Sequence, residues 1–338
     1  MLKFFFRYYK LLMFGVLQIF FTAPGQTFLV SLFVAYIYQD LAISHSKFAA
    51  VYSIATLSAA LLLNRIGALI DRYAPSRILV FVCFAMALGC VLLANAKSVL
   101  VLGLAFFILR LFGQGVFGLF GSTVLARFFK ANRGKAMGIA SLGFPLSEAI
   151  YPSVALFLIV VLGWRGSYLV FAIITIASML PLQHILLKNA LLTSPKEEEI
   201  STETSQLKNT ENDYRLIDAL KEVRFYLIIL ASCIPPVVMT ALLFHQYAIF
   251  QSHGWPIIYA ATGLTIYAIN KAVGSVFIGW VVDRIGPFYP FAIMILMIGI
   301  GTLLVGIGGP LWVGFIYFAL MGMALGFSSP IINVLYAD

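Results

Sequence analysis

Gly67-Ala-Leu-Ile-Asp71-Arg72 and Gly279-Trp-Val-Val-Asp283-Arg284 are two copies of one motif, Gly-x-x-x-Asp-Arg, in opposite halves of the chain. Each copy follows a long apolar stretch, and we expect it to lie on the short polar turn that ends that stretch. Internal repeats of this kind occur in polytopic membrane proteins whose two halves share one fold. The motif therefore predicts that the same membrane unit occurs twice.

The amino-acid composition also requires a membrane. Hydrophobic residues make up 62% of the 338 residues and charged residues only 10%, and the mean hydropathy is +1.00. Soluble domains carry about 25% charged residues, so this composition excludes a soluble domain. We expect an all-α polytopic membrane protein.

Apolar stretches of membrane-spanning length follow one another along the chain. A bilayer core about 30 Å thick needs about 20 residues of helix at a rise of about 1.5 Å per residue. An even number of spans places both ends of the chain on one side. The ten expected spans are residues 11–37, 48–69, 78–95, 99–121, 136–161, 166–187, 223–251, 257–281, 288–307 and 310–334.

Positive charges fall mostly on one face of this arrangement. Eleven Lys and Arg residues lie in short segments on the side of the amino terminus, against three on the other side. Because cytoplasmic loops carry the excess of Lys and Arg, we expect a cytoplasmic amino terminus. The same bias accounts for the net charge of +9, so no nucleic-acid partner is expected. The eleven are Lys3, Arg7, Lys10, Arg65, Arg72, Arg77, Arg127, Lys130, Arg133, Lys135 and Arg284, and the three are Lys47, Lys97 and Arg165.

One long polar segment divides the chain. Residues 188–222 are rich in Ser, Thr, Asn and Glu and begin without apolar periodicity, which is typical of a mobile linker. The expected organisation is a six-helix bundle at 1–187, a cytoplasmic linker at 188–222 and a four-helix bundle at 223–338.

Three charged residues, Arg110, Glu148 and Lys271, lie clearly inside the expected spans, each near the middle of the bilayer. Charges at that depth cost several kcal/mol and are kept for transport, coupling or a buried ion pair. Arg110 shares a helical face with Gln114, and Lys271 follows Tyr267 by one turn. One cation from each half predicts a negatively charged substrate between them. The alternative is that Glu148 permanently neutralises Arg110 while Lys271 points into a water pocket.

Glu148 could serve in two ways. Left unpaired and desolvated, it would hold a proton near neutral pH; paired to Arg110, it would stay ionised. We expect a switch between the two, in which substrate arriving at Arg110 releases Glu148 to take up a proton. His245, in the outer third of its span, is a second candidate for proton coupling, with a histidine satisfied by helix-end partners as the alternative.

The duplicated motif carries the expected gate. Its carboxylates, at cytoplasmic helix ends, could accept hydrogen bonds from a neighbouring helix terminus or pair with a basic side chain. Such contacts would hold the inner ends closed in one state and break in the other, whereas the alternative is a polar turn that only fixes topology. The gating candidates are Gly67, Asp71, Arg72, Gly279, Asp283 and Arg284.

These features together resemble the major facilitator superfamily: the two Gly-x-x-x-Asp-Arg copies, the halves separated by a linker, and Arg110-Leu-Phe-Gly-Gln-Gly115. Within it, Gly25-Gln-Thr-Phe28, Gly163-Trp-Arg165 and Phe244-His-Gln246 resemble bacterial relatives of the monocarboxylate porters. The chain departs from the family in having Ala74 where the motif usually continues with glycine. It also stops after the tenth span, where the family has twelve.

The resemblance implies a secondary transporter of the bacterial inner membrane, working by alternating access as a monomer, with Gln26 among the residues lining its path. It also implies that the last two helices are missing, which would leave Lys271 facing lipid or an open groove and make the chain part of a longer form. No nucleotide-binding loop, metal-ligand spacing or nucleophile with a histidine occurs, so no enzyme, cofactor or metal ion is expected. The expected partners are a small organic anion, a proton and the lipid bilayer. The alternatives are efflux of other small molecules, a non-transporting membrane sensor, a truncated inactive product and, from another class, an intramembrane enzyme.

Overall fold

The computed structural model describes the whole chain except residues 1, 71–72, 130–132, 194–221 and 336–338. The described residues form helices joined by short connections, with no strand among them. This confirms the all-α polytopic class. Most of the expected linker falls in 194–221 and so lies outside the described residues.

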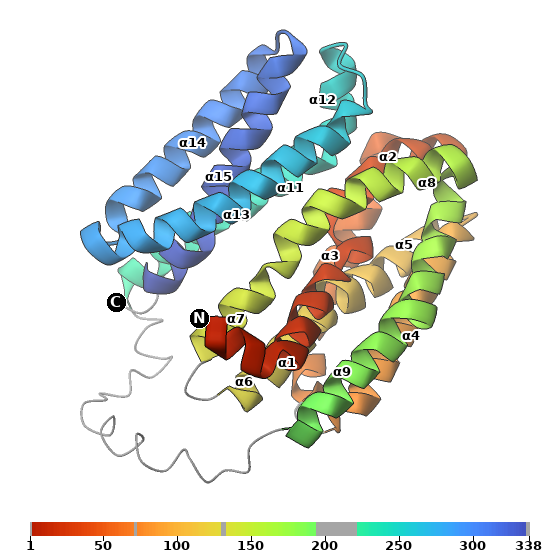
Figure 1. Cartoon of the computed structure of the whole chain (residues 1–338). Coiled ribbons are helices and arrows are strands. Elements are labelled where there is room, and N and C mark those ends of the chain that lie inside the picture. The colour runs from red at the N-terminus through yellow and green to blue at the C-terminus, as the bar shows by residue number, and fades with distance from the viewer. Residues whose placement is uncertain (1, 71–72, 130–132, 194–221, 336–338) are drawn as a thin grey trace.

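The helices before the linker pack against one another as a first bundle, drawn red to green in Figure 1. Two of its segments, η2 and η3, are π-helices, and η1 is a single 3-10 turn that contains Pro24. That turn breaks the first expected span into α1 and α2, because proline cannot donate the backbone hydrogen bond that a continuous helix needs. The elements are α1 (Leu2–Phe20), η1 (Ala23–Gly25), α2 (Thr27–Asp40), α3 (His45–Ile70), α4 (Pro75–Ala94), α5 (Val99–Ile108), η2 (Leu109–Val116), α6 (Phe117–Phe128), α7 (Arg133–Ser141), α8 (Gly143–Ile173), η3 (Ile174–Met179) and α9 (Leu180–Thr193).

The helices after the linker form a second bundle, in which α13 and α14 both pack on α15. In Figure 1, α1 begins and α15 ends at one end of the molecule, which we call the terminus end; the opposite end, where α2 ends and α12 lies, is the loop end. The elements are α11 (Val223–Phe244), α12 (Gln246–Ser252), α13 (Tyr259–Ile285), α14 (Phe288–Ile307) and α15 (Leu311–Leu335).

Seven stretches of the described chain are long and apolar enough to cross a membrane, or eight if the bent pair α11 and α12 counts as one span. One of the seven, Ala136–Lys188, covers 53 residues and contains two limbs, because Gly163 breaks the helix with φ +70°. Helix α13 is 27 residues long and carries Lys271 within it, and it falls outside this set. With the two limbs separated and α11–α12 and α13 included, these segments correspond to the ten expected spans.

A cluster around Arg165 fixes the loop end of the first bundle. Its guanidinium donates to the carbonyl oxygens of Ala94 and Ala96, both at 2.7 Å, and pairs with Asp40 at 2.8 Å. The Trp164 indole donates to the same Asp40 carboxylate at 3.2 Å, and the guanidinium lies over the Trp164 ring at 4.4 Å. Arg165 thereby ties the end of α2 to the α4–α5 connection and to the bend at Gly163.

Replacing Arg165 with alanine should lower the free energy of unfolding by about 2 kcal/mol, since it removes charge-assisted bonds to three groups that are partly open to solvent. Thermal unfolding of the purified protein in detergent measures this. The stability of Arg165→Lys should lie between that of the wild type and that of Arg165→Ala, because one ammonium cannot reach all three acceptors. The exposed Arg77 is the matched control, and an Arg77→Ala variant that lost as much stability would show that the cluster has no special role.

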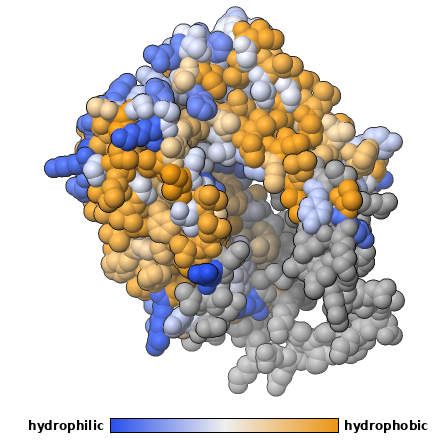
Figure 2. Space-filling model, turned by 180° about the vertical axis from the view of Figure 1, so that it is seen from behind, coloured by the Kyte–Doolittle hydropathy of each residue, from blue (hydrophilic) through white to orange (hydrophobic). Residues whose placement is uncertain are grey.

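The two bundles meet along α8 and α13 and, at the loop end, where α2 contacts α11 and α12. Figure 2 shows the surface hollowed between two largely apolar flanks. The flanks carry exposed apolar side chains such as Val160, 81% exposed, and Ile307, 81% exposed, which suit contact with lipid. The contact region between the bundles is therefore where a polar site would be enclosed.

The structure corrects the expected position of the repeated motif. Gly67 lies inside the last turn of α3, and Gly279, Asp283 and Arg284 lie inside α13. Helix α13 continues to Ile285 and is capped by Gly286, whose φ of +75° suits a residue without a side chain. The second copy is therefore a helix end and not a turn. Helix α9 likewise continues to Thr193, past the expected start of the linker at 188.

Candidate functional site

Arg110 lies in the π-helix η2, which packs against the break between α1 and α2. The backbone of the break and that of η2 approach each other closely here. A side-chain carbon on Gly25 would collide with the carbonyl oxygen of Leu109, and one on Gly113 would meet the Gly25 backbone at 3.0 Å. Glycine at both positions lets the two chain segments touch. π-helical turns, with their i→i+5 bonding, are frequent at functional sites.

Neutral groups hold the Arg110 guanidinium. It donates to Thr56 Oγ1 at 3.1 Å, to Thr27 Oγ1 at 3.1 Å and to the Gly25 carbonyl oxygen at 3.3 Å. The Tyr52 ring centre lies 5.2 Å from Cζ, and the Tyr52 hydroxyl is 3.2 Å from Thr27 Oγ1. No carboxylate pairs with Arg110 within the described part of the chain. Its positive charge is fixed in place, and none of the described carboxylates neutralises it.

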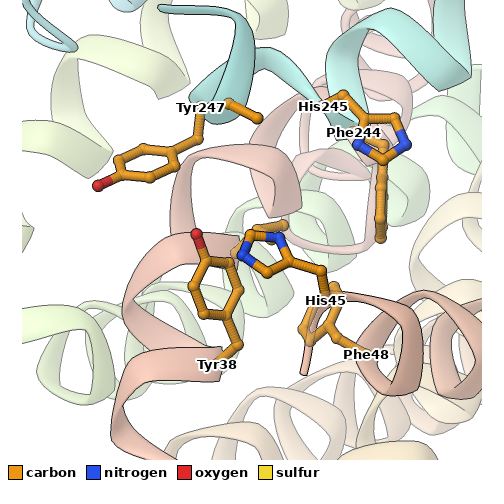
Figure 3. A pocket seen from close by; sticks show the side chains of 8 residues that line it. Tyr38, His45, Phe48, Phe244, His245 and Tyr247 are labelled. Carbon is orange, nitrogen blue, oxygen red and sulfur yellow. The ribbon is translucent and has the colours of Figure 1, made fainter. Parts of the chain in front are cut away.

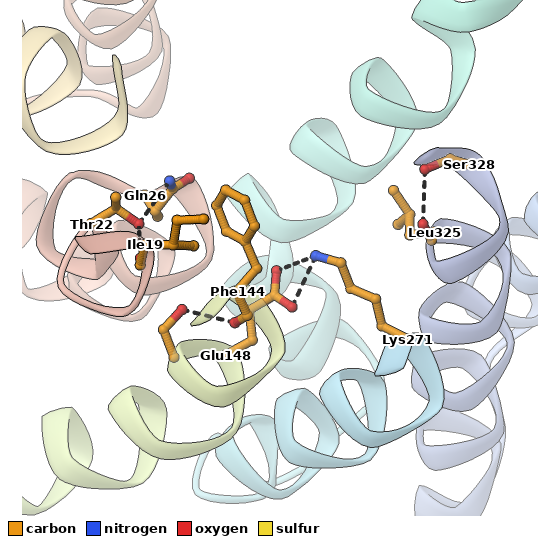
Figure 4. A network of polar contacts seen from close by, with 9 residues as sticks. Ile19, Thr22, Gln26, Phe144, Glu148, Lys271, Leu325 and Ser328 are labelled. Atoms are coloured by element: carbon orange, nitrogen blue, oxygen red, sulfur yellow. Dashed lines mark hydrogen bonds and ion pairs between the residues drawn. The ribbon is translucent and has the colours of Figure 1, made fainter. Parts of the chain in front are cut away.

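Glu148 pairs with Lys271 and not with Arg110 (Figure 4). Lys271 Nζ lies 2.7 Å from Oε1 and 3.0 Å from Oε2, so the ammonium bridges both carboxylate oxygens. The Glu148 side chain is 9% exposed and that of Lys271 is 23% exposed. The pairing of Glu148 with Arg110, one of the two states considered from the sequence, does not occur in this arrangement, because α8 faces α13 across the boundary between the bundles.

Aromatic rings enclose the Lys271 ammonium, which lies 5.5 Å from the centre of the buried Tyr267 ring and 5.8 Å from that of Phe144. We expected Lys271 to face lipid or an open groove; its side chain is 23% exposed and therefore only partly open. Glu148, Tyr267 and Phe144 cover its charged end instead.

The α1–α2 break brings the two charged centres to one region. Gly25 lies against Leu109 and Gly113 of η2, and the Phe20 ring lies 5.1 Å from that of Tyr151 in α8. The segment that carries Arg110 and the helix that carries Glu148 therefore both pack against this break. Gln26, half-buried in the break, donates from Nε2 to Thr22 Oγ1 at 3.2 Å, and its side chain appears in the same view as the ion pair in Figure 4.

Two other expected site residues lie elsewhere. Gln114 is exposed, one turn beyond Arg110. His245 is exposed at the loop end, where it lines a pocket between α2, α3 and α11–α12 (Figure 3). The structure therefore does not bring His245 to the central charges. The pocket is lined by Val34, Tyr38, His45, Phe48, Phe244, His245, Tyr247 and Ala248.

The gating candidates can be placed only in part. Asp71 and Arg72 lie outside the described residues, and neither the Asp283 side chain nor the surroundings of Gly67 and Gly279 are described. Arg284 is exposed near the end of α13. Their gating role stays a prediction.

Sequence reasoning missed Tyr52 and Thr56 as partners of Arg110. Both lie on α3, one turn apart, and so share a helical face. That spacing was available in the sequence, but nothing in it indicated that this face of α3 meets η2.

The comparisons with known proteins agree with this architecture. The family model of the Major Facilitator Superfamily matches residues 16–338. Among solved structures, a bacterial homologue of the human lysosomal transporter Spinster, crystallised inward-facing and unoccupied, superposes with a TM-score of 0.68 at 14% identity, covering 97% of this chain and 74% of that one. The nucleoside transporter NupG gives 0.64 at 15% identity, covering 97% and 80%. No curated protein sequence matches significantly.

At such low identity the structural matches show the fold alone, whereas the family match extends over nearly the whole chain. Apolar helices of spanning length make it a multi-pass membrane protein. The chain belongs to the major facilitator superfamily, a family of transmembrane transporters and not of enzymes.

Proposed function

We propose that this protein is a secondary transporter that moves a small organic anion, of monocarboxylate type, together with a proton by alternating access. The observation that carries the proposal is the Arg110 guanidinium, held by Thr27, Thr56 and the Gly25 carbonyl with no carboxylate partner among the described residues. A buried cation without a counter-ion is costly, and an anionic ligand removes that cost. Guanidinium groups also match the planar geometry of a carboxylate.

The charge balance supports a substrate with a single negative charge. Glu148 neutralises Lys271 in their ion pair, so the three central charges together leave one net positive charge, on Arg110. A monocarboxylate would balance that charge, whereas a dicarboxylate would leave one negative charge in excess. The arrangement therefore favours the monoanion.

The ion pair also supplies a route for coupling to a proton. A substrate carboxylate that attracts the Lys271 ammonium would leave Glu148 unpaired among apolar groups. A desolvated carboxylate favours its protonated form, so Glu148 would take up a proton while the anion is bound. Because Glu148 lies on α8 and Lys271 on α13, this exchange would take place at the boundary between the bundles. Alternating access requires contacts at that boundary that form and break.

We further infer that the first bundle, which ends at Thr193, and the second, which begins at Val223, move as two bodies joined by the segment between them. They lie in the inner membrane of a bacterial cell, with the terminus end in the cytoplasm. The excess of Lys and Arg in segments at the terminus end supports this orientation. The contacts of α2 with α11 and α12 then close the outer side. A monomer suffices, since the charged centres come from one chain.

A screen of organic acids tests the substrate class. We expect one or more monocarboxylates to raise the unfolding temperature of the purified wild-type protein and to exchange across reconstituted vesicles, with dicarboxylates and neutral nucleosides weaker. Stabilisation by a neutral or cationic compound and by no acid would contradict the anion site. Binding of an acid without flux would favour a membrane sensor.

Site-specific labelling tests the orientation. Single cysteines replacing Lys47 and Ser205, in a background without Cys83, Cys90 and Cys233, should react with a membrane-impermeant maleimide from opposite faces of intact cells. Position 47 should label from outside, and position 205 only after the membrane is opened. Reaction of both from outside would overturn the proposed orientation.

A further inference from the structure

Phe244 of the second bundle inserts its ring among aromatic side chains of the first. It is the last residue of α11, at the 59° bend to α12. Its ring centre lies 5.6 Å from that of Phe48 and 5.2 Å from that of Tyr52, both buried on α3. A ring at a bend between two helix segments moves with any change in that bend. Phe244 is therefore a contact through which motion at the loop end reaches the first bundle.

Tyr52 connects this contact to the central cation. The Tyr52 ring contacts the Phe244 ring, and it also contacts Arg110, whose Cζ lies 5.2 Å from the Tyr52 ring centre. The Tyr52 hydroxyl and the Arg110 guanidinium both bond to Thr27 Oγ1. A shift of the Tyr52 ring would therefore change the cation–π contact and the shared hydroxyl at the same time.

A second aromatic ring supports the same connection. Phe106 lies one turn before Arg110 along the chain and meets both Phe48 and Tyr52 edge-on, at 5.5 Å and 5.2 Å. Helix α5, which continues into the η2 segment that carries Arg110, therefore packs against the two rings that Phe244 contacts. Phe48 and Phe244 also line the loop-end pocket (Figure 3).

We propose that Phe244 is a positioning residue for the anion site: its docking on Tyr52 when the loop end is closed fixes the Arg110 guanidinium, and its withdrawal when the loop end opens releases it. The anion site is complete only while the loop end is closed. This inference rests on the proposed role of Arg110, and it assigns the second bundle a part in positioning a guanidinium whose hydrogen-bond partners, among the described residues, come from the first.

Chemical labelling of Arg110 tests the proposal without a known substrate. Phenylglyoxal, a neutral reagent that adds to guanidinium groups, is applied to the full-length protein in detergent, and peptide mass spectrometry measures its addition to Arg110 relative to the exposed Arg77 in the same molecule. Phe244→Leu should raise the relative rate at Arg110 about threefold, the size of a lost cation–π contact. Phe244→Tyr keeps a ring and should label as the wild type does.

Two further variants separate positioning from general loosening. Tyr52→Leu should raise Arg110 labelling at least as much as Phe244→Leu, and the double variant should add nothing, because both changes act through one contact. Phe250 is the matched control: it is a buried ring of α12 whose partners, Trp255 and Phe318, lie in its own bundle. Phe250→Leu should leave Arg110 labelling unchanged.

Each outcome decides the matter. Wild-type labelling in Phe244→Leu, additive effects in the double variant, or an equal rise in Phe250→Leu would each overturn the positioning role. Because the readout needs no bound anion, failure of the organic-acid screen would refute the proposed function while the labelling result still stood on its own.

Discussion

Arg110→Ala is expected to reduce binding of the transported anion by at least about a hundredfold, equivalent to about 3 kcal/mol. The guanidinium is the one central charge without a carboxylate partner among the described residues, so its removal takes away the group that the substrate carboxylate would neutralise. Thr27 and Thr56 would lose their bonds to it but could hydrogen-bond water. Isothermal titration with the best acid from the screen measures the loss.

Matched variants make this test specific. Arg110→Lys keeps the charge but not the planar, two-nitrogen geometry, and should retain part of the affinity. Arg77→Ala removes an exposed arginine outside the site and should bind as the wild type does. If Arg110→Ala folds normally, as judged by its thermal unfolding, and still binds the anion at wild-type affinity, Arg110 is not the anion contact.

The positions and order of the long apolar helices could be predicted from sequence because bilayer thickness fixes how long an apolar helix must be. The same arithmetic predicts the depth of Arg110 and Lys271 in the bilayer, and this depth stays a prediction. Their direction around the helix axis could not be predicted in this way. That direction depends on local winding and on which helix packs alongside, which one sequence does not reveal.

The face of Arg110 illustrates the limit. Regular α-helical spacing aligned it with Gln114, but η2 is a π-helix with more residues per turn, so this alignment is lost. Gln114 is exposed, whereas Arg110 is partly buried. The choice of partner for Glu148 failed for a related reason: contact between α8 and α13 joins segments far apart in the chain, and the interaction with Lys271 spans 123 residues.

Lys271→Met is expected to destabilise the protein by about 3–5 kcal/mol, because it leaves the Glu148 carboxylate buried without its ammonium partner. The double variant Glu148→Gln with Lys271→Met should recover much of that loss, since it removes both charges together. Lys47→Met, at an exposed position of the loop end, is the control and should unfold as the wild type does. Equal destabilisation in the single and double variants would show that the pair contributes packing and not charge compensation.

Glu148→Gln separates stability from coupling, because the amide keeps the shape of the carboxyl group but cannot exchange a proton. In vesicles with a pH-sensitive dye inside, wild-type transport should carry protons with the anion, whereas Glu148→Gln should exchange anion for anion without moving protons. Such a variant should also fail to concentrate the anion against its gradient when the outside is acidified. Proton movement that persists in Glu148→Gln, at the wild-type ratio to anion, would place the coupling group elsewhere in the chain and leave the Glu148–Lys271 pair as a structural contact between the bundles.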